Sequence, residues 1–160
     1  MESTVCCPSF DPRPWDGTTH VWADKPFLKD EMPQFLHIPL PGVMSKTITR
    51  MWEFARKHKA TTEAQDFLLL TYDPSPWKSE LYMALTKDLH DVPNVVKLSG
   101  NYISKVYDGS YSQVPKYIKD MEAFLKQQGK KAKRYYFYYT TCPKCAKKYG
   151  HNYIVLLSEI

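Results

Sequence analysis

"NVVKLSGNYISKVYDG" (94–109) leads directly into "YSQVPKYIKDMEAFLKQQGK" (111–130), and this junction decides the predicted fold. The first segment is typical of a strand. The second has apolar residues at helical spacing, with a proline confined to the first turn and Gly129 as a terminator. Two further strands are predicted in "KRYYFYYTTC" and "NYIVLLSEI". The C-terminal half of the chain therefore has the predicted order βαββ.

The N-terminal half shows the same order of patterns. A strand is predicted in "MPQFLHIPL" (32–40), a helix over 43–60, and a hairpin from "DFLLLTYD" (66–73) and "KSELYMALTKDL" (78–89). We therefore expect an α+β fold of two tandem βαββ halves, about 31–90 and 94–160, in a single domain at 31–160 with an antiparallel sheet. A groove between the halves is the expected ligand site.

Composition limits the function classes. The chain has 160 residues, 43% of them hydrophobic, and a formal net charge of +5, as expected for one globular domain. No apolar run approaches the ~20 residues of a membrane span, so we predict a cytoplasmic protein without membrane contact. No nucleic-acid-binding signature accompanies the charge, so no nucleic acid partner is expected. The oligomeric state is left open.

Residues 1–30 contain four prolines and no regular period, which predicts an irregular arm packed on the domain. Its aromatic residues would lose their burial if the arm were detached. "FDPRPWDG" (10–17) fits either a rigid plug or a lid over a ligand, and the plug is favoured. Trp15 and Trp22 are candidates for contacts near the groove.

The segment "GNYISKVYDGSYSQVPKYIKDM" (100–121) resembles the GyrI-like family, the effector-binding fold of gyrase-inhibitory proteins and drug-sensing regulators. The resemblance rests on Tyr107, Gly109 and Tyr111 and on the double βαββ order. It implies a pseudo-twofold fold that binds amphipathic or cationic small molecules in an aromatic groove, and some members hydrolyse cyclopropane-bearing genotoxins. The family's ligand-neutralising Glu would fall at about Phe137, where this chain has no carboxylate.

Tyrosines dominate the predicted strand near residue 137. Strand alternation places Tyr136, Tyr138 and Thr140 on one face and Tyr135, Phe137 and Tyr139 on the other, and one face is expected to line the groove. The alternative is that all of these rings belong to the core or to a half-exposed sheet. The predicted ligand-binding residues are Trp15, Trp22, Trp77, Tyr82, Tyr107, Tyr136 and Tyr138.

The cysteines offer a possible structural zinc site. Cys142 and Cys145 have the spacing that grips one Zn²⁺, Cys6 and Cys7 would complete a four-sulfur site, and His151 is a nearby candidate ligand. The favoured interpretation is buried or capping thiols with no cofactor, because the chain has "CC" where a second CxxC is expected. A thiol-disulfide role is disfavoured, because only fifteen residues follow Cys145.

Glu80 is the carboxylate we select to orient a ligand or activate a water, because it shares a strand face with Tyr82. The alternative is a solvated edge carboxylate. The chain has no GxSxG, HExxH or P-loop. The leading hypothesis is a small-molecule-binding protein that sequesters planar or amphipathic compounds. The alternatives are a hydrolase of the cyclopropanoid type that uses the same groove, and a zinc-stabilised interaction module.

Overall fold

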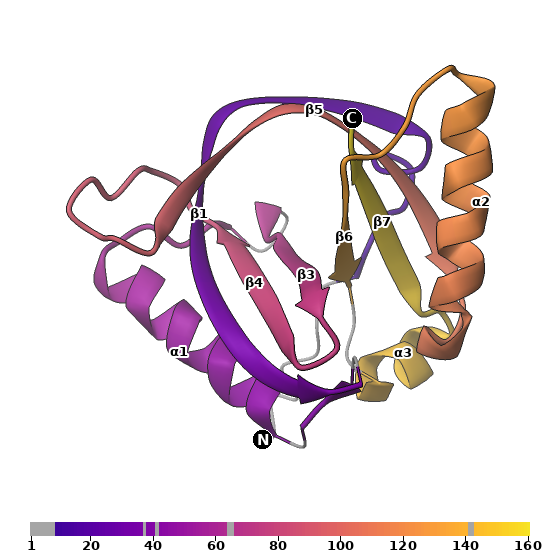
Figure 1. Ribbon diagram of the computed structural model, residues 1–160. Coiled ribbons are helices and arrows are strands. Elements are labelled where there is room, and N and C mark those ends of the chain that lie inside the picture. Colours follow the sequence, from indigo (N-terminus) through magenta and orange to yellow (C-terminus); the bar gives the residue numbers. More distant parts are fainter. Residues whose placement is uncertain (1–8, 37, 41, 64–65, 141–142) are drawn as a thin grey trace. The chain divides into compact units, whose positions relative to one another are not determined.

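The computed structural model describes residues 9–36, 38–40, 42–63, 66–140 and 143–160 (Figure 1). The chain divides into two compact units. We call Trp22–Ser99 the central unit, and Met1–Val21 together with Gly100–Ile160 the terminal unit. Strands β1 (Thr18–Phe35) and β5 (Val95–Asp108) each contribute residues to both units.

In its described residues, the central unit is an antiparallel sheet with one α-helix. It contains most of β1, followed by β2 (Ile38–Pro39), α1 (Val43–Lys57), β3 (Leu69–Ser75) and β4 (Lys78–Ala84). β1 pairs with β2 on one side and with β4 on the other, from Phe27↔Ala84 to Pro33↔Lys78. β3 and β4 form a hairpin.

Helix α1 follows Gly42, whose φ of 73° is a left-handed conformation that glycine adopts without steric cost. Its buried residues, Thr47, Met51 and Ala55, recur every four positions and so form one face of the helix. The helix predicted over 43–60 is therefore present, and it ends at Lys57.

The terminal unit contains β5, a 3₁₀ turn at Tyr111–Gln113, α2 (Val114–Gln127), β6 (Arg134–Tyr139), α3 (Pro143–Tyr149) and β7 (Tyr153–Glu159). β7 lies between β5 and β6 and is antiparallel to both. The core beneath α2 is formed by Ile103, Met121, Leu125 and Leu156.

The predicted fold class, two tandem βαββ halves behind an irregular arm, is wrong. Residues 18–30 were assigned to the arm, but they belong to the eighteen-residue strand β1, which pairs with β4 and with β5. The pairing of β1 with β5 shows that residues assigned to the arm belong to the sheet. The GyrI-like pseudo-twofold arrangement was inferred from those halves and is not supported either.

Prolines are compatible with strand β1, although they led to the prediction of an irregular arm over residues 18–30. A strand tolerates proline where the sheet does not need its missing N–H. Pro33 occupies the last register pair between β1 and β4, and Pro26 contributes its carbonyl, which accepts the Leu85 N–H at 3.1 Å.

Among the described residues, no helix is long and apolar enough to cross a bilayer.

Candidate functional site

Strand β6 separates its aromatic side chains between two faces. Tyr135 and Phe137 pack against the core beneath α2. Tyr136 and Tyr138 alternate with them, so they project from the opposite face, where they are only 1% and 8% exposed. The Tyr136 ring lies 6.4 Å from that of Tyr102. Both predicted ligand-binding tyrosines of β6 therefore lie inside the terminal unit.

The segment before β1 packs on this tyrosine face. Phe10 meets Tyr138 edge-to-face with 6.1 Å between ring centroids, and Trp15 approaches the same ring at 6.4 Å. Trp15 also contacts the His20 ring at 4.8 Å. The structure thus brings together two predicted residues, Trp15 and Tyr138.

Ser104 and His20 form a serine–histidine pair with the wrong proton arrangement for a nucleophile. The completely buried Ser104 hydroxyl donates to the Trp15 carbonyl at 2.5 Å, and the His20 Nε2 lies 2.7 Å from the same oxygen. A hydroxyl has one proton, so His20 must donate to the serine and cannot act as its base. This pair anchors the chain near Trp15 and is not a candidate catalytic dyad.

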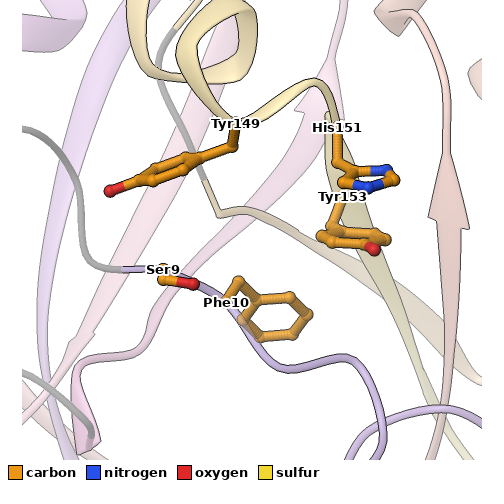
Figure 2. Close-up of a pocket in the computed structure, with 5 residues that line it drawn as sticks. All are labelled: Ser9, Phe10, Tyr149, His151 and Tyr153. Carbon is orange, nitrogen blue, oxygen red and sulfur yellow. The ribbon is translucent and has the colours of Figure 1, made fainter.

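A cavity of about 180 Å³ lies at the start of β7 and was missed by the sequence analysis. Figure 2 shows its lining residues, in which the His151 and Tyr153 rings lie one above the other. His151 Nδ1 is 2.7 Å from Asp108 Oδ2. His151 was considered only as a zinc ligand, and its pairing with Asp108 depends on the β5–β7 register. The lining residues are Ser9, Phe10, Tyr149, His151 and Tyr153.

Tyr107 lies on the α2 side of β5, away from Tyr136 and Tyr138. Its ring stacks on Tyr117 of α2 at 4.5 Å, and its hydroxyl donates to Asp120 at 2.6 Å. Burial, followed by the hydrogen bond to the Asp120 carboxylate, raises the pKa of Tyr107. The hydroxyl therefore stays protonated, and its contacts attach α2 to the sheet.

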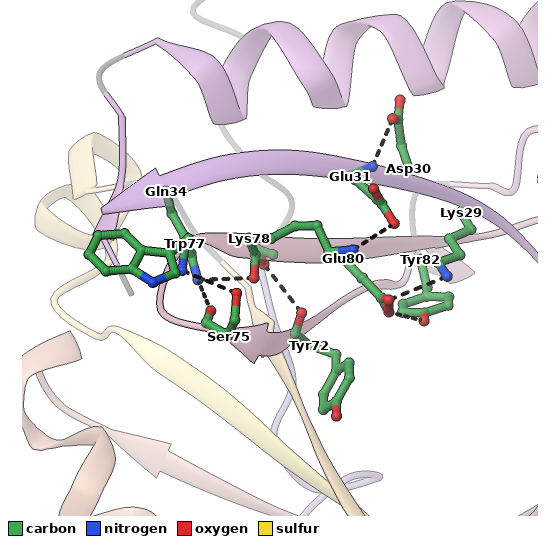
Figure 3. Close-up of polar contacts among 11 residues, drawn as sticks. Lys29, Asp30, Glu31, Gln34, Tyr72, Ser75, Trp77, Lys78, Glu80 and Tyr82 are labelled. Carbon is green, nitrogen blue, oxygen red and sulfur yellow. Dashed lines mark hydrogen bonds and ion pairs between the residues drawn. The ribbon is translucent and has the colours of Figure 1, made fainter. Parts of the chain in front are cut away.

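In the central unit, the predicted tryptophans lie apart. Trp22 packs on Phe27 with 5.6 Å between ring centroids. Trp77 lies in the turn between β3 and β4, is 56% exposed and lies 5.5 Å from the Phe35 ring. In Figure 3 Trp77 is at one end of β4 and Glu80 is further along the strand.

Glu80 is held by two side chains from neighbouring positions. The Tyr82 hydroxyl donates to Glu80 Oε2 at 2.7 Å, and Lys29 Nζ lies 3.3 Å from Oε1. Figure 3 shows both groups converging on the carboxylate. The Glu80 side chain is only 12% exposed and the Lys29 side chain 32%. The predicted pairing of Glu80 with Tyr82 is therefore present, and Lys29 is an addition to it.

The strand register explains this cluster. Alternation places Glu80 and Tyr82 on one face of β4 and buries Ser79, Leu81 and Met83 on the other. β1 places Lys29 opposite Tyr82 and therefore diagonal to Glu80. Lys29 was not identified from the sequence because it lies in the segment taken for an arm.

Glu31 provides a useful contrast to Glu80. It lies directly opposite Glu80 in the register, its side chain is 50% exposed, and it pairs with Lys78 at 3.2 Å. Each of the two facing carboxylates therefore has its own lysine. Only the Glu80 carboxylate also accepts a buried tyrosine hydroxyl and is shielded from solvent, which are features of a carboxylate positioned for chemistry.

Comparison with known proteins identifies the family. A family model described as "Bacterial hydrolase" matches residues 1–160. The chain belongs to this family. A solved structure titled "Crystal structure of an uncharacterized conserved protein from Listeria innocua" is similar in fold, with a TM-score of 0.62 and 11% sequence identity over 90% of this chain and 92% of that one. The curated proteins include no match.

The structure describes little of the predicted zinc site. Cys6, Cys7 and Cys142 lie outside the described residues, and Cys145 lies in α3. Across the described part of the chain, no three His, Cys, Asp or Glu side chains gather as metal ligands would. The zinc site therefore stays a prediction.

Proposed function

We propose that this member of the Bacterial hydrolase family hydrolyses a small organic substrate with Glu80 as the general base. The observation that carries the proposal is the largely buried Glu80 carboxylate, fixed on one oxygen by Tyr82 and on the other by Lys29. A carboxylate has about four acceptor positions, so these two contacts leave lone pairs that a water can use. Such a water would be oriented by a base that cannot rotate.

The proposed reaction needs no covalent intermediate. Glu80 takes a proton from the water as the water oxygen forms a bond to an electrophilic carbon of the substrate. The bond from that carbon to the leaving group breaks, and its electron pair passes to the leaving group together with the proton that Glu80 took from the water. Lys29 and Tyr82 stabilise the carboxylate in the orientation that accepts the proton.

We propose a planar or amphipathic aromatic substrate. Tyr72 supports this choice, because it faces Glu80 in the register with β3 and its side chain is only partly buried. An aromatic ring at this position would bind a flat apolar compound through its face. A cyclopropane conjugated to a carbonyl of the aromatic system is the probe of choice, because water attack on its ring carbon breaks a strained C–C bond whose electron pair passes to the conjugated carbonyl.

Turnover of the cyclopropane-bearing aromatic, followed by chromatography, tests the proposal. Glu80→Gln removes the base but keeps the size of the side chain, so we expect the rate to fall by roughly 10²-fold or more. Glu31→Gln is the matched control, because it removes the facing, exposed carboxylate, and it should retain the rate. Tyr82→Phe should give an intermediate loss.

Two results would contradict parts of this scheme. Undiminished turnover by Glu80→Gln would exclude Glu80 as the base. Binding of the aromatic, seen as a change in tryptophan or tyrosine fluorescence, without any turnover would instead favour the sequestering function predicted from the tyrosine content.

A further inference from the structure

The cavity at the start of β7 is formed by aromatic side chains of the terminal unit. Phe10 reaches it from the segment before β1, Tyr149 from the end of α3, and His151 and Tyr153 from the chain that enters β7. Among the residues that the structure describes, Ser9 is the one other that lines it. None of these residues belongs to the Glu80 cluster of the central unit, so the cavity is a separate candidate site.

Three of the rings that line the cavity pack on one another or on the buried core. The His151 and Tyr153 rings stack at 5.1 Å with an interplanar angle of 11°, which provides a flat pair of rings. Phe10 is tilted by 53° to Tyr153 and packs edge-on against the buried Tyr138. A preformed site of this kind loses little conformational entropy on binding.

Asp108 determines the hydrogen-bonding character of His151. Asp108 Oδ1 accepts the Asn152 backbone N–H at 2.9 Å, which leaves Oδ2 facing His151 Nδ1 at 2.7 Å. The hydrogen bonds to His151 and to the Asn152 N–H lower the pKa of Asp108, so the carboxylate is ionised and accepts the Nδ1 proton. In the neutral imidazole, Nε2 is then a hydrogen-bond acceptor.

The volume and the chemistry together limit the ligand. An apolar protein cavity of about 150 Å³ is large enough to hold benzene, so a cavity of about 180 Å³ admits one substituted aromatic ring. The Asp108 charge next to the site disfavours an anion. When His151 is neutral, its Nε2 acceptor favours a ligand that carries an O–H or N–H donor.

We propose that this cavity binds a small uncharged aromatic compound of the phenol or indole class, with its ring against Phe10, Tyr149 and Tyr153 and its donor on His151 Nε2. The site is independent of the hydrolase proposal, because its residues lie in the other unit.

The test compares p-cresol with p-xylene, which has nearly the same shape but no donor, by NMR titration of the ¹⁵N-labelled full chain. We expect p-cresol to shift the amide signals of residues 149–153 and to bind roughly five- to tenfold more tightly than p-xylene, as one net hydrogen bond implies. His151→Phe keeps a flat ring without the acceptor, and Asp108→Asn removes the charge that orients the imidazole. Both variants should bind p-cresol only as well as p-xylene.

Glu80→Gln is the matched control and should bind p-cresol like the unchanged protein. Equal affinity for p-cresol and p-xylene would overturn the donor requirement, as would full p-cresol affinity in His151→Phe. Shifts confined to residues outside the cavity, or no shifts at millimolar p-cresol, would overturn the site itself. None of these outcomes depends on whether Glu80→Gln retains turnover.

Discussion

A buried polar side chain is not by itself a catalytic group, as a comparison of Glu80 with Ser104 shows. The Ser104 hydroxyl contacts a carbonyl and a histidine and has one proton to donate, so its position secures the fold. Glu80 also has two contacts, but a carboxylate has acceptor positions beyond them. The remaining hydrogen-bonding capacity distinguishes Glu80, the candidate base, from Ser104, which has a structural role.

His20 makes the stability of the terminal unit depend on pH. Burial lowers the pKa of His20 from its ordinary value of 6.5, so the unfolded chain binds a proton more readily than the folded chain. The contribution of His20 to the free energy of unfolding should therefore be fully present above pH 6.5. It should be lost as the pH falls from 6.5 to the lowered pKa of His20. Urea unfolding at pH 7.5 and 5.5 measures this loss.

His20→Gln is the control for this titration, because its amide donates to the Ser104 hydroxyl but does not titrate in this range. The loss of stability between pH 7.5 and 5.5 should be smaller in this variant. An identical loss in both proteins would show that other groups cause the pH dependence.

At the scale of elements, Gly109 determines how β5 meets α2. A Cβ at this position would lie 2.2 Å from the Tyr117 hydroxyl oxygen, whereas the next atom of that ring is 3.5 Å away. Gly109→Ala should therefore push the Tyr117 ring off Tyr107 and destabilise the protein by about 1 kcal/mol. Adding Tyr117→Phe removes the clashing oxygen and should restore most of the loss in thermal or urea unfolding. A double variant no more stable than Gly109→Ala would place the strain elsewhere.

Elements with a strong local pattern could be predicted from the sequence, and those that depend on pairing could not. The helix around Met51 was found because its apolar residues repeat at helical spacing. The end of β1 lies in the strand predicted over 32–40, but residues 18–30 were missed because the prolines of residues 1–30 suggest breaks and the ladder with β4 is not visible in one strand. α3 was not predicted, because a seven-residue helix has too few turns to show a period.

In the candidate site too, contacts within one strand could be predicted from the sequence, and contacts between strands could not. Glu80 and Tyr82 lie two residues apart on one strand, so alternation alone predicts that they share a face. Lys29 and Glu80, and likewise Asp108 and His151, meet only through the register between strands far apart in sequence. The sequence therefore identified one carboxylate correctly placed beside its tyrosine, but not the partner lysine or the second pocket.

At the scale of the whole molecule, β1 and β5 link the stability of the two units, because each strand supplies residues to both. Loss of either core should therefore unfold both units together. Leu81→Ala in the central core and Met121→Ala in the terminal core remove completely buried side chains, and each should cost about 2–5 kcal/mol. Far-UV circular dichroism and tryptophan fluorescence should follow one shared urea transition in each variant. Two transitions, with each substitution shifting only its own, would show that the units unfold independently.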